Sequence, residues 1–441
     1  MTKWELATPT DPNANASNDN SRRPPRPQRK KPKRVSYARG VRKVGETGEE
    51  QGHTGSILSV AVSPSGRFVA TGGADNKLII WNADTLTPAK TFTQHRDSVS
   101  CLSFARHIST MSSGEQLFSG SYDRTIKTWS VSGAGHAYVE TLFGHQSGVE
   151  QIAAMTIDEC VSVGGQDRSS RLWKVIDETQ LVFRGGASKN APYHETHLDC
   201  VAPLPPAHFV TGSNSGSISL WSIHKKKPLH TIPLAHGLDS IPPLDELSPE
   251  VDLETAAHNA RHMRPMPRWI TALTSLPGTD IVLSGSWDGW IRAWQISEDK
   301  KTLIPLGPIG TKNPTQAIPD TPSKQLNSSL DPDDMDAEDE TQNKNLEPGH
   351  LIKGVVNDIA VFERRPESDQ QGLPAPKSKS DSKSESAVKG LCIVAAIGKE
   401  HRLGRWKCYA NNYSQGASPE GRNGAVVLEV PFISNAVEVD V

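Results

Sequence analysis

The sequence lacks a long apolar segment, a large net charge and any paired cysteine motif. Its most apolar run, Leu391 to Ile397, has seven residues, whereas a membrane-spanning helix needs roughly 20, so we expect no membrane partner. The 48 Lys and Arg residues nearly cancel the 50 Asp and Glu residues, so any contact with nucleic acid must come from a local patch of cations. The five cysteines show no CxxC spacing, which argues against a metal site or a disulfide framework and favours reduced thiols.

Motifs of catalysis are missing as well. The sequence has no GxSxG, HExxH or Walker motif, and these carry nucleophilic, zinc-dependent and nucleotide chemistry respectively. We therefore expect no enzyme activity, no cofactor and no small-molecule substrate.

A repeated phrase is present instead. Five stretches end in a tryptophan and carry a short polar residue six positions earlier: Trp81, Trp129, Trp173, Trp221 and Trp294 follow Asp75, Asp123, Asp167, Ser215 and Asp288. A histidine precedes the first four tryptophans by 28, 34, 28 and 27 residues, at His53, His95, His145 and His194. Met266 takes this place before the fifth, and apolar residues follow each slot at the fourth and seventh positions.

Each repeat reads as short strands joined by turns. The runs SILSVAVS, GRFVATGG and NKLIIWNA alternate in polarity and are separated by Ser, Gly, Asp and Asn, and the run after the tryptophan supplies a fourth strand. A four-stranded unit that recurs about every 40–45 residues predicts an all-β WD-repeat β-propeller. A sixth, degenerate repeat has Glu400 six residues before Trp406, and we expect its third strand to end at this tryptophan.

The repeats predict the domain organisation. We expect a remnant of a first blade at residues 1–8, where TKWELAT resembles a tryptophan-closing phrase, and a basic disordered linker at 9–50. Propeller blades follow at 51–306, then an acidic disordered insertion at 307–350. The last blade and closing strand occupy 351–441 and contain a Ser/Lys-rich disordered loop at 364–388.

The histidine, the acid, the tryptophan and a strand hydroxyl are expected to form a structural constellation. The hydroxyls are Thr71, Ser119, Thr211 and Ser284, four residues before the acid position, and the third repeat has Val163 there. A His, Asp and Ser set also occurs in hydrolases, but this one recurs once per repeat. Mutual hydrogen bonding of buried polar groups explains it better.

A basic run at residues 21–43 holds 11 Lys and Arg residues and no acid. Three interpretations stay open: contact with RNA phosphates, a nuclear import signal, or a merely soluble tail. The central cations of this run are Arg29, Lys30, Lys31, Lys33 and Arg34. The acidic run at 331–340 is either a solvated spacer or a protein-binding element.

Several phrases are more specific than the repeat itself. RFVATGGADNKLIIW, YVETLFGHQSGVE, CVSVGGQDRSSRLWKVIDETQLVFRGG and GKEHRLGRW resemble the WD-repeat proteins associated with U3 small nucleolar RNA, an rRNA-processing family of the small-subunit processome. The resemblance implies a seven-bladed propeller, of which six units and a remnant are countable here. It also suggests a fungal-type member whose first blade is truncated.

The resemblance further implies a non-enzymatic role. Family members bind U3 RNA after a kink-turn-binding protein, join other processome proteins and support maturation of small-subunit rRNA in the nucleus and nucleolus. A generic WD-repeat scaffold for proteins, without direct RNA contact, is the alternative. The candidate RNA surface is the face with the acid-containing turns, and its cations are Lys77, Arg124, Arg168, His401, Arg402 and Arg405. The competing interpretation of each is ordinary solvated turn charge.

Overall fold

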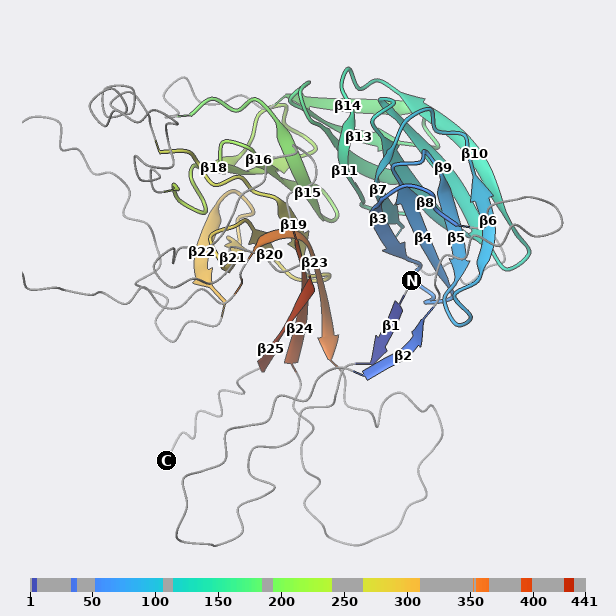
Figure 1. Ribbon diagram of the computed structural model, residues 1–441. Helices are drawn as coiled ribbons and strands as arrows, with labels where there is room; N and C mark the ends of the chain where they lie inside the picture. The colour runs from blue at the N-terminus through green and yellow to red at the C-terminus, as the bar shows by residue number, and fades with distance from the viewer. Residues whose placement is uncertain are drawn as a thin grey trace, which may run out of the picture. The chain divides into compact units, whose positions relative to one another are not determined.

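Every element in the described part of the chain is a β-strand (Figure 1). The computed structural model describes residues 2–5, 33–37, 52–105, 114–184, 193–239, 265–309, 352, 354–364, 390–398 and 424–431. These residues fall into two compact units, Met1–Leu142 and Phe143–Val441. The described elements include no helix that could cross a membrane.

The first unit contains a two-stranded sheet and two four-stranded antiparallel sheets. In the small sheet, β1 (Thr2–Glu5) pairs with β2 (Lys33–Tyr37). Blade A has the order β3 (Ile57–Val62), β4 (Phe68–Gly73), β5 (Leu78–Asn82) and β6 (Pro88–Phe92). Blade B has the order β7 (Val99–Phe104), β8 (Glu115–Ser121), β9 (Thr125–Ser132) and β10 (Gly135–Phe143).

The second unit contains three four-stranded sheets and one three-stranded sheet. Blade C comprises β11 (Val149–Ala154), β12 (Glu159–Gly164), β13 (Ser169–Lys174) and β14 (Thr179–Arg184). Blade D comprises β15 (Leu198–Leu204), β16 (His208–Ser213), β17 (Ile218–Ser222) and β18 (His230–Ile232). Blade E comprises β19 (Ala272–Ser275), β20 (Ile281–Gly285), β21 (Ile291–Ile296) and β22 (Leu303–Pro308). Blade F comprises β23 (Val355–Arg364), β24 (Gly390–Gly398) and β25 (Gly424–Pro431).

Five of the six described blades, all except blade E, share a local irregularity in their first strand. The register between the first and second strands shifts just after the apolar residue that begins the strand pairing, and a β-bulge of this kind bends a strand and increases its twist. The shift lies at Ile57/Ser59, Val99/Cys101, Val149/Gln151, Leu198/Cys200 and Val356/Asp358. The repeated sequence thus encodes a repeated bend as well as a repeated strand.

The hydrophobic core lies between successive blades. In the first unit, Val99 and Trp129 of blade B pack with Ala70, Leu78 and Ile80 of blade A. In the second unit, equivalent clusters join blade C to D, D to E, and E to F. Each fully buried Leu or Ile side chain contributes about 1.5–3 kcal/mol, so packing between blades, more than any single hairpin, stabilises the fold.

One sheet face is uncovered by the described residues. Ile57, Val60 and Val62 of β3 are 51, 53 and 60% exposed, whereas Val99 and Leu102, which take the places of Ile57 and Val60 in blade B, are 0 and 8% exposed. In blade B the apolar residues of the first strand are buried against the preceding blade, whereas the corresponding residues of blade A are exposed.

Two predictions on strand placement need correction. Residues Lys33–Tyr37, expected in a disordered basic linker, form strand β2, because Val35, Ser36 and Tyr37 follow the last proline of the run and favour an extended chain. In blade F the strand next to β24 is β25, not a segment ending at Trp406. Glu400 and Trp406 lie outside the described residues.

Candidate nucleic-acid interface

A chain of buried hydrogen bonds ties the strands of blade A together. The Trp81 indole Nε1 donates to Thr71 Oγ1 at 2.7 Å, and His53 Nε2 lies 2.8 Å from the same hydroxyl. His53 Nδ1 donates to the Asp75 carboxylate at 2.8 Å. Each buried polar group therefore has a partner, which avoids the cost of about 1–3 kcal/mol for a buried group without one.

The same constellation recurs in blades B, C and E. The distances from the histidine Nδ1 to the carboxylate are 2.8–2.9 Å, and those from Nε2 to the hydroxyl are 2.8 Å. The sets are His95, Asp123, Ser119 and Trp129; His145, Asp167, Ser162 and Trp173; and His236, Asp288, Ser284 and Trp294. The predicted tryptophans of blades A to E all lie on the third strand of their sheet.

Blade C does have a strand hydroxyl. It belongs to Ser162, one residue before Val163, which occupies the expected position. Ser162 accepts the Trp173 indole N–H at 2.7 Å and lies 2.8 Å from His145 Nε2. The turn between β12 and β13 is one residue longer before Asp167 than the corresponding turn of blade A. A count from the acid therefore lands one residue past the functional serine.

Met266 does not occupy the histidine slot of blade E. His236, which is fully buried, bonds Asp288 and Ser284 there. The chain between His236 and β19 carries a long insertion whose ends are tied by the Leu238–Pro267 bridge. The prediction assumed a fixed spacing from the tryptophan, and the insertion places the histidine farther away. The pattern Ala235-His236-Gly237 was the signal that could have identified it.

Blade D departs further, and its predicted histidine is also wrong. His194 is exposed, and the neighbouring Glu195 is 8% exposed instead. Glu195 Oε2 accepts from Ser217 Oγ at 3.4 Å, while Trp221 still donates to Thr211 at 2.9 Å. Burial raises the pKa of Glu195, opposed by the Ser217 hydrogen bond and the charge of Arg168.

The carboxylates of the constellation are held ionised. Burial raises the pKa of Asp167, but the hydrogen bond and charge of His145 and two backbone N–H groups outweigh it and lower the pKa to about 2. For Asp288, burial is likewise outweighed by the charge and hydrogen bond of His236 and by the charge of Arg292, so its pKa is also about 2. The pKa of Asp123 lies well below its usual range for similar reasons, with His95 and Thr125 as donors.

Each of these acids also fixes the turn that follows it. Asp123 accepts the backbone N–H of Thr125 at 2.9 Å and that of Arg96 at 3.0 Å. The next residue of the turn is left-handed in all five blades with this turn described, at Asn76 (φ 62°), Arg124 (φ 69°), Arg168 (φ 50°), Gly216 (φ 72°) and Gly289 (φ 86°). Blades B and C therefore hold an arginine where the backbone favours Gly or Asn.

Three candidate cations are described with their side chains. Arg124 and Arg168 are exposed, and Lys77 is partly buried. The neighbouring acids Asp123 and Asp167 are engaged by histidine and backbone donors, so they leave both guanidinium groups open to solvent. The described part of β2 contains the backbone of Lys33 and Arg34, and the other candidates lie outside the described residues: Arg29, Lys30, Lys31, His401, Arg402 and Arg405.

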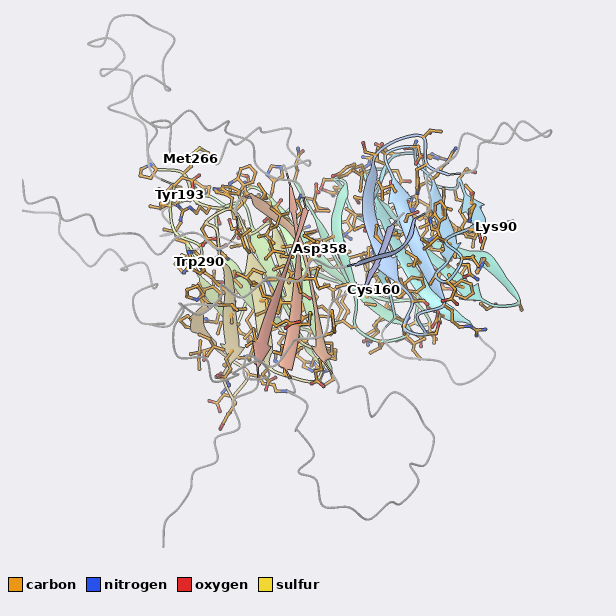
Figure 2. The ribbon with its side chains drawn as sticks, turned by 60° about the horizontal axis from the view of Figure 1, so that its bottom comes forward. Lys90, Cys160, Tyr193, Met266, Trp290 and Asp358 are labelled. Carbon is orange, nitrogen blue, oxygen red and sulfur yellow. The ribbon has the colours of Figure 1, made fainter. Side chains whose placement is uncertain are left out.

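Sequence reasoning missed an aromatic cluster around the insertion of blade E. Asp239 accepts from the Trp287 indole at 3.0 Å and from Arg268 Nε at 2.8 Å, and the rings of Trp269 and Trp287 meet edge to face at 5.6 Å. The Tyr193 hydroxyl donates to the Pro265 carbonyl at 2.7 Å, beside Met266 (Figure 2). The four tryptophans between residues 269 and 294 were the feature of the sequence that could have indicated this cluster.

The repeated constellation and the sheets define a WD-repeat β-propeller protein. A family model described as WD domain, G-beta repeat matches residues 46–82, 86–130 and 262–295. The chain is 31% identical to ribosomal RNA-processing protein 9 of Saccharomyces cerevisiae, over 86% of this chain and 61% of that protein. It is 36% identical to human U3 small nucleolar RNA-interacting protein 2, over 59% of this chain and 47% of that protein.

A solved structure agrees with these sequence relatives. The crystal structure of the RRP9 WD40 repeats superposes with a TM-score of 0.56 at 28% identity, covering 86% of this chain and 82% of that one. The chain spans less than two thirds of the length of the two curated relatives. Its homologues carry the names of U3 and rRNA-processing proteins, which confirms the predicted resemblance to the U3-associated WD-repeat family.

Proposed function

We propose that this protein is a non-enzymatic ribonucleoprotein component that binds U3 small nucleolar RNA and supports pre-rRNA processing to small-subunit rRNA. The observation that carries the proposal is the pair of exposed arginines at left-handed turn positions in blades B and C. A left-handed non-glycine residue costs about 1 kcal/mol or more. Two exposed arginines at such positions place positive charge on turns whose backbone is fixed, which suits contact with phosphate.

The chemistry of the turns suits phosphate recognition. Guanidinium groups pair with phosphate through two parallel hydrogen bonds, and the hydrogen-bonded Asp turns hold the backbone of each arginine in one conformation. Structured RNA is recognised mostly by shape and phosphate contacts. Rigid turns that present cations meet this requirement without reading bases.

The partner and location follow from the same proposal. A kink-turn-binding protein fixes the RNA shape before this protein docks, and other processome proteins complete the particle in the nucleolus. The basic run that contains Arg29, Lys30 and Lys31 directs nuclear import or adds RNA contacts, and Arg402 and Arg405 extend the surface. The acidic insertion at 307–350 acts as a linker between blades E and F, and the Ser/Lys-rich insertion at 364–388 connects two strands of blade F.

Binding to U3 RNA in the presence and absence of the kink-turn-binding protein tests the function. With a net charge of −2, the chain has little general attraction for RNA, so we expect weak binding alone and tight binding to the pre-kinked complex. Filter binding measures both affinities. Equal, weak binding in the two cases overturns the ordered assembly, and no binding in either overturns the RNA role.

A protein scaffold without RNA contact is the second candidate, and one observation favours it. Met266 is 48% exposed beside Tyr193, and Trp290 is partly exposed on the same unit (Figure 2). Aromatic residues and Met are enriched at protein interfaces. If binding requires a protein partner and is indifferent to every arginine described above, the scaffold role replaces the RNA role.

A further inference from the structure

Blade C contains a second pair of arginines that none of the preceding functional assignments uses. Arg171 lies on β13 and Arg184 on β14, and the register pairs Ser169 with Arg184 and Arg171 with Val182. Directly paired residues share a face of the sheet, and long side chains also reach diagonal neighbours. The two guanidinium groups therefore belong to one face of blade C.

The Arg171 guanidinium is buried, fixed and incompletely paired. Arg171 is only 9% exposed, and its Nη1 donates to Gln180 Oε1 at 2.7 Å. Its Nε is buried and has no hydrogen-bond partner. Because Nη1 is occupied by Gln180, the edge of the guanidinium group that carries Nε is left for another acceptor. Such an edge can bind a phosphate or carboxylate through parallel hydrogen bonds.

Glycine shapes the space around this group. A Cβ at Gly144 would collide with Arg171 Nη1, Gln180 and Trp173, so the absence of a side chain at this position leaves room for the guanidinium group. A buried donor of this kind destabilises the fold while it is unpaired.

The carboxylate whose charge acts on Arg171, that of Asp167, is already engaged by other donors. Asp167 already accepts from His145, Gln146 N and both the N–H and the hydroxyl of Ser169. Burial lowers the pKa of Arg171, the charge of Asp167 raises it, and the charge of Arg184 lowers it by a smaller amount. The Asp167 carboxylate therefore does not bond the Arg171 Nε, and the two neighbouring arginines can attract a further anion.

The equivalent arginine of blade E shows the paired arrangement. Arg292, like Arg171, stands two residues before the tryptophan, and its Nε donates to Asp288 at 3.0 Å. In blade C the corresponding Nε lacks this bond. The difference distinguishes a structural arginine from one that awaits a ligand.

We propose that Arg171 and Arg184 form a phosphate-binding notch on blade C that receives a backbone phosphate of the bound RNA. This inference rests on the proposed function, and it extends the RNA surface from the exposed Arg168 turn along β13 to the outer strand β14. Arg171 would supply the directional fork and Arg184 the second charge.

Two single variants of the full chain test the notch by filter binding to U3 RNA at several salt concentrations. Arg184→Gln alters an exposed side chain and should fold normally; we expect a loss of about tenfold in affinity and a salt slope smaller by about one unit. Arg171→Lys keeps the charge but not the fork; we expect a similar loss of affinity with little change in slope. The matched control is Lys225→Gln, an exposed lysine after the third strand of blade D, which should bind as wild type.

A second measurement does not depend on RNA. Inorganic phosphate, compared with chloride at equal ionic strength, should raise the melting temperature of the wild type more than that of either variant. If the wild type binds RNA and both variants bind equally well, the notch is wrong and the proposed function stands. If the wild type binds no RNA, the proposed function fails, and the phosphate shift decides the notch: equal shifts in all proteins overturn it.

Discussion

At the scale of the residue, one imidazole connects three parts of a blade. His236 bonds the Ser284 hydroxyl and the Asp288 carboxylate, and Ser284 accepts the indole N–H of Trp294. The histidine thus links the entry of the blade to its second strand, its turn and its third strand. Loss of the histidine removes a partner from two buried polar groups, so the constellation contributes to the stability of the blade.

Replacing His236 tests this role. His236→Ala should lower the free energy of unfolding by about 1–3 kcal/mol, because Ser284 and Asp288 lose a partner while remaining buried. His194→Ala is the matched control, since His194 is exposed and should tolerate the change. Urea denaturation of both variants provides the comparison, and equal stability of the two would contradict the assignment of His236 to the slot. His95→Ala should behave like His236→Ala.

Acid stability follows from the same residues. The folded pKa values of Asp167 and Asp288 are about 2, below the ordinary value of 3.8. A lowered folded pKa stabilises the protein above the unfolded pKa, and this stability is lost as the pH falls toward the folded value. The free energy of unfolding should therefore drop between about pH 4 and pH 2.

Asp288→Asn identifies the source of that drop. The variant should be less stable near neutral pH and should show a shallower dependence on acid, because one of the low-pKa carboxylates is gone. Denaturation at pH 2.5, 4 and 6 gives the slope. A variant with an unchanged slope would show that Asp288 does not carry the acid dependence.

At the scale of the element, the turn between the second and third strands allows the stability of the fold and the proposed RNA binding to be tested separately. Blades D and E place Gly216 and Gly289 at the left-handed position, whereas blades B and C place Arg124 and Arg168 there. Glycine adopts this conformation without steric cost. The arginines are thus a local exception to the rule that the other blades follow.

Substituting glycine for the turn arginines should therefore have opposite effects on two properties. Arg124→Gly and Arg168→Gly together should leave stability unchanged or raise it by up to about 1 kcal/mol per site, while RNA affinity falls. Thermal melting and filter binding on the same preparation measure the two effects. A clear loss of stability would mean that the arginines serve the fold.

The elements also show where sequence reasoning succeeds and where it stops. The tryptophans of blades A to E were predictable because each third strand keeps the same alternation and the same distance to its turn. Ser162 and His236 were not, since one extra turn residue and one long insertion change the spacing without changing the hydrogen bonds. The third strand of blade F was placed at Trp406 instead of at β25, because residues 399–423 separate β25 from β24. Arg171 was not singled out because only three-dimensional packing reveals an unpaired Nε.

At the scale of the whole molecule, nuclear import and RNA contact are the two proposed uses of the basic run, and they can be tested separately. Lys33 and Arg34 lie in β2, so deleting the whole run would also remove a strand. Replacing Arg29, Lys30 and Lys31 by Gln leaves β2 in the chain and should weaken nuclear accumulation. Fluorescence microscopy of the tagged variant checks this, and normal nucleolar concentration would show that import depends on partners instead.

The central claim is that cations on the acid-containing turns bind U3 RNA, and charge reversal tests it most directly. Arg124→Glu and Arg168→Glu should together lower the affinity for U3 RNA bound to the kink-turn-binding protein and reduce the salt slope by about one unit per lost phosphate contact. Lys225→Glu and Lys226→Glu make the same change in charge at exposed positions at the other end of the blade D strand β17. The account predicts a much smaller effect for this second pair; an unaltered affinity and slope for the arginine pair, with binding abolished by the lysine pair, would contradict it.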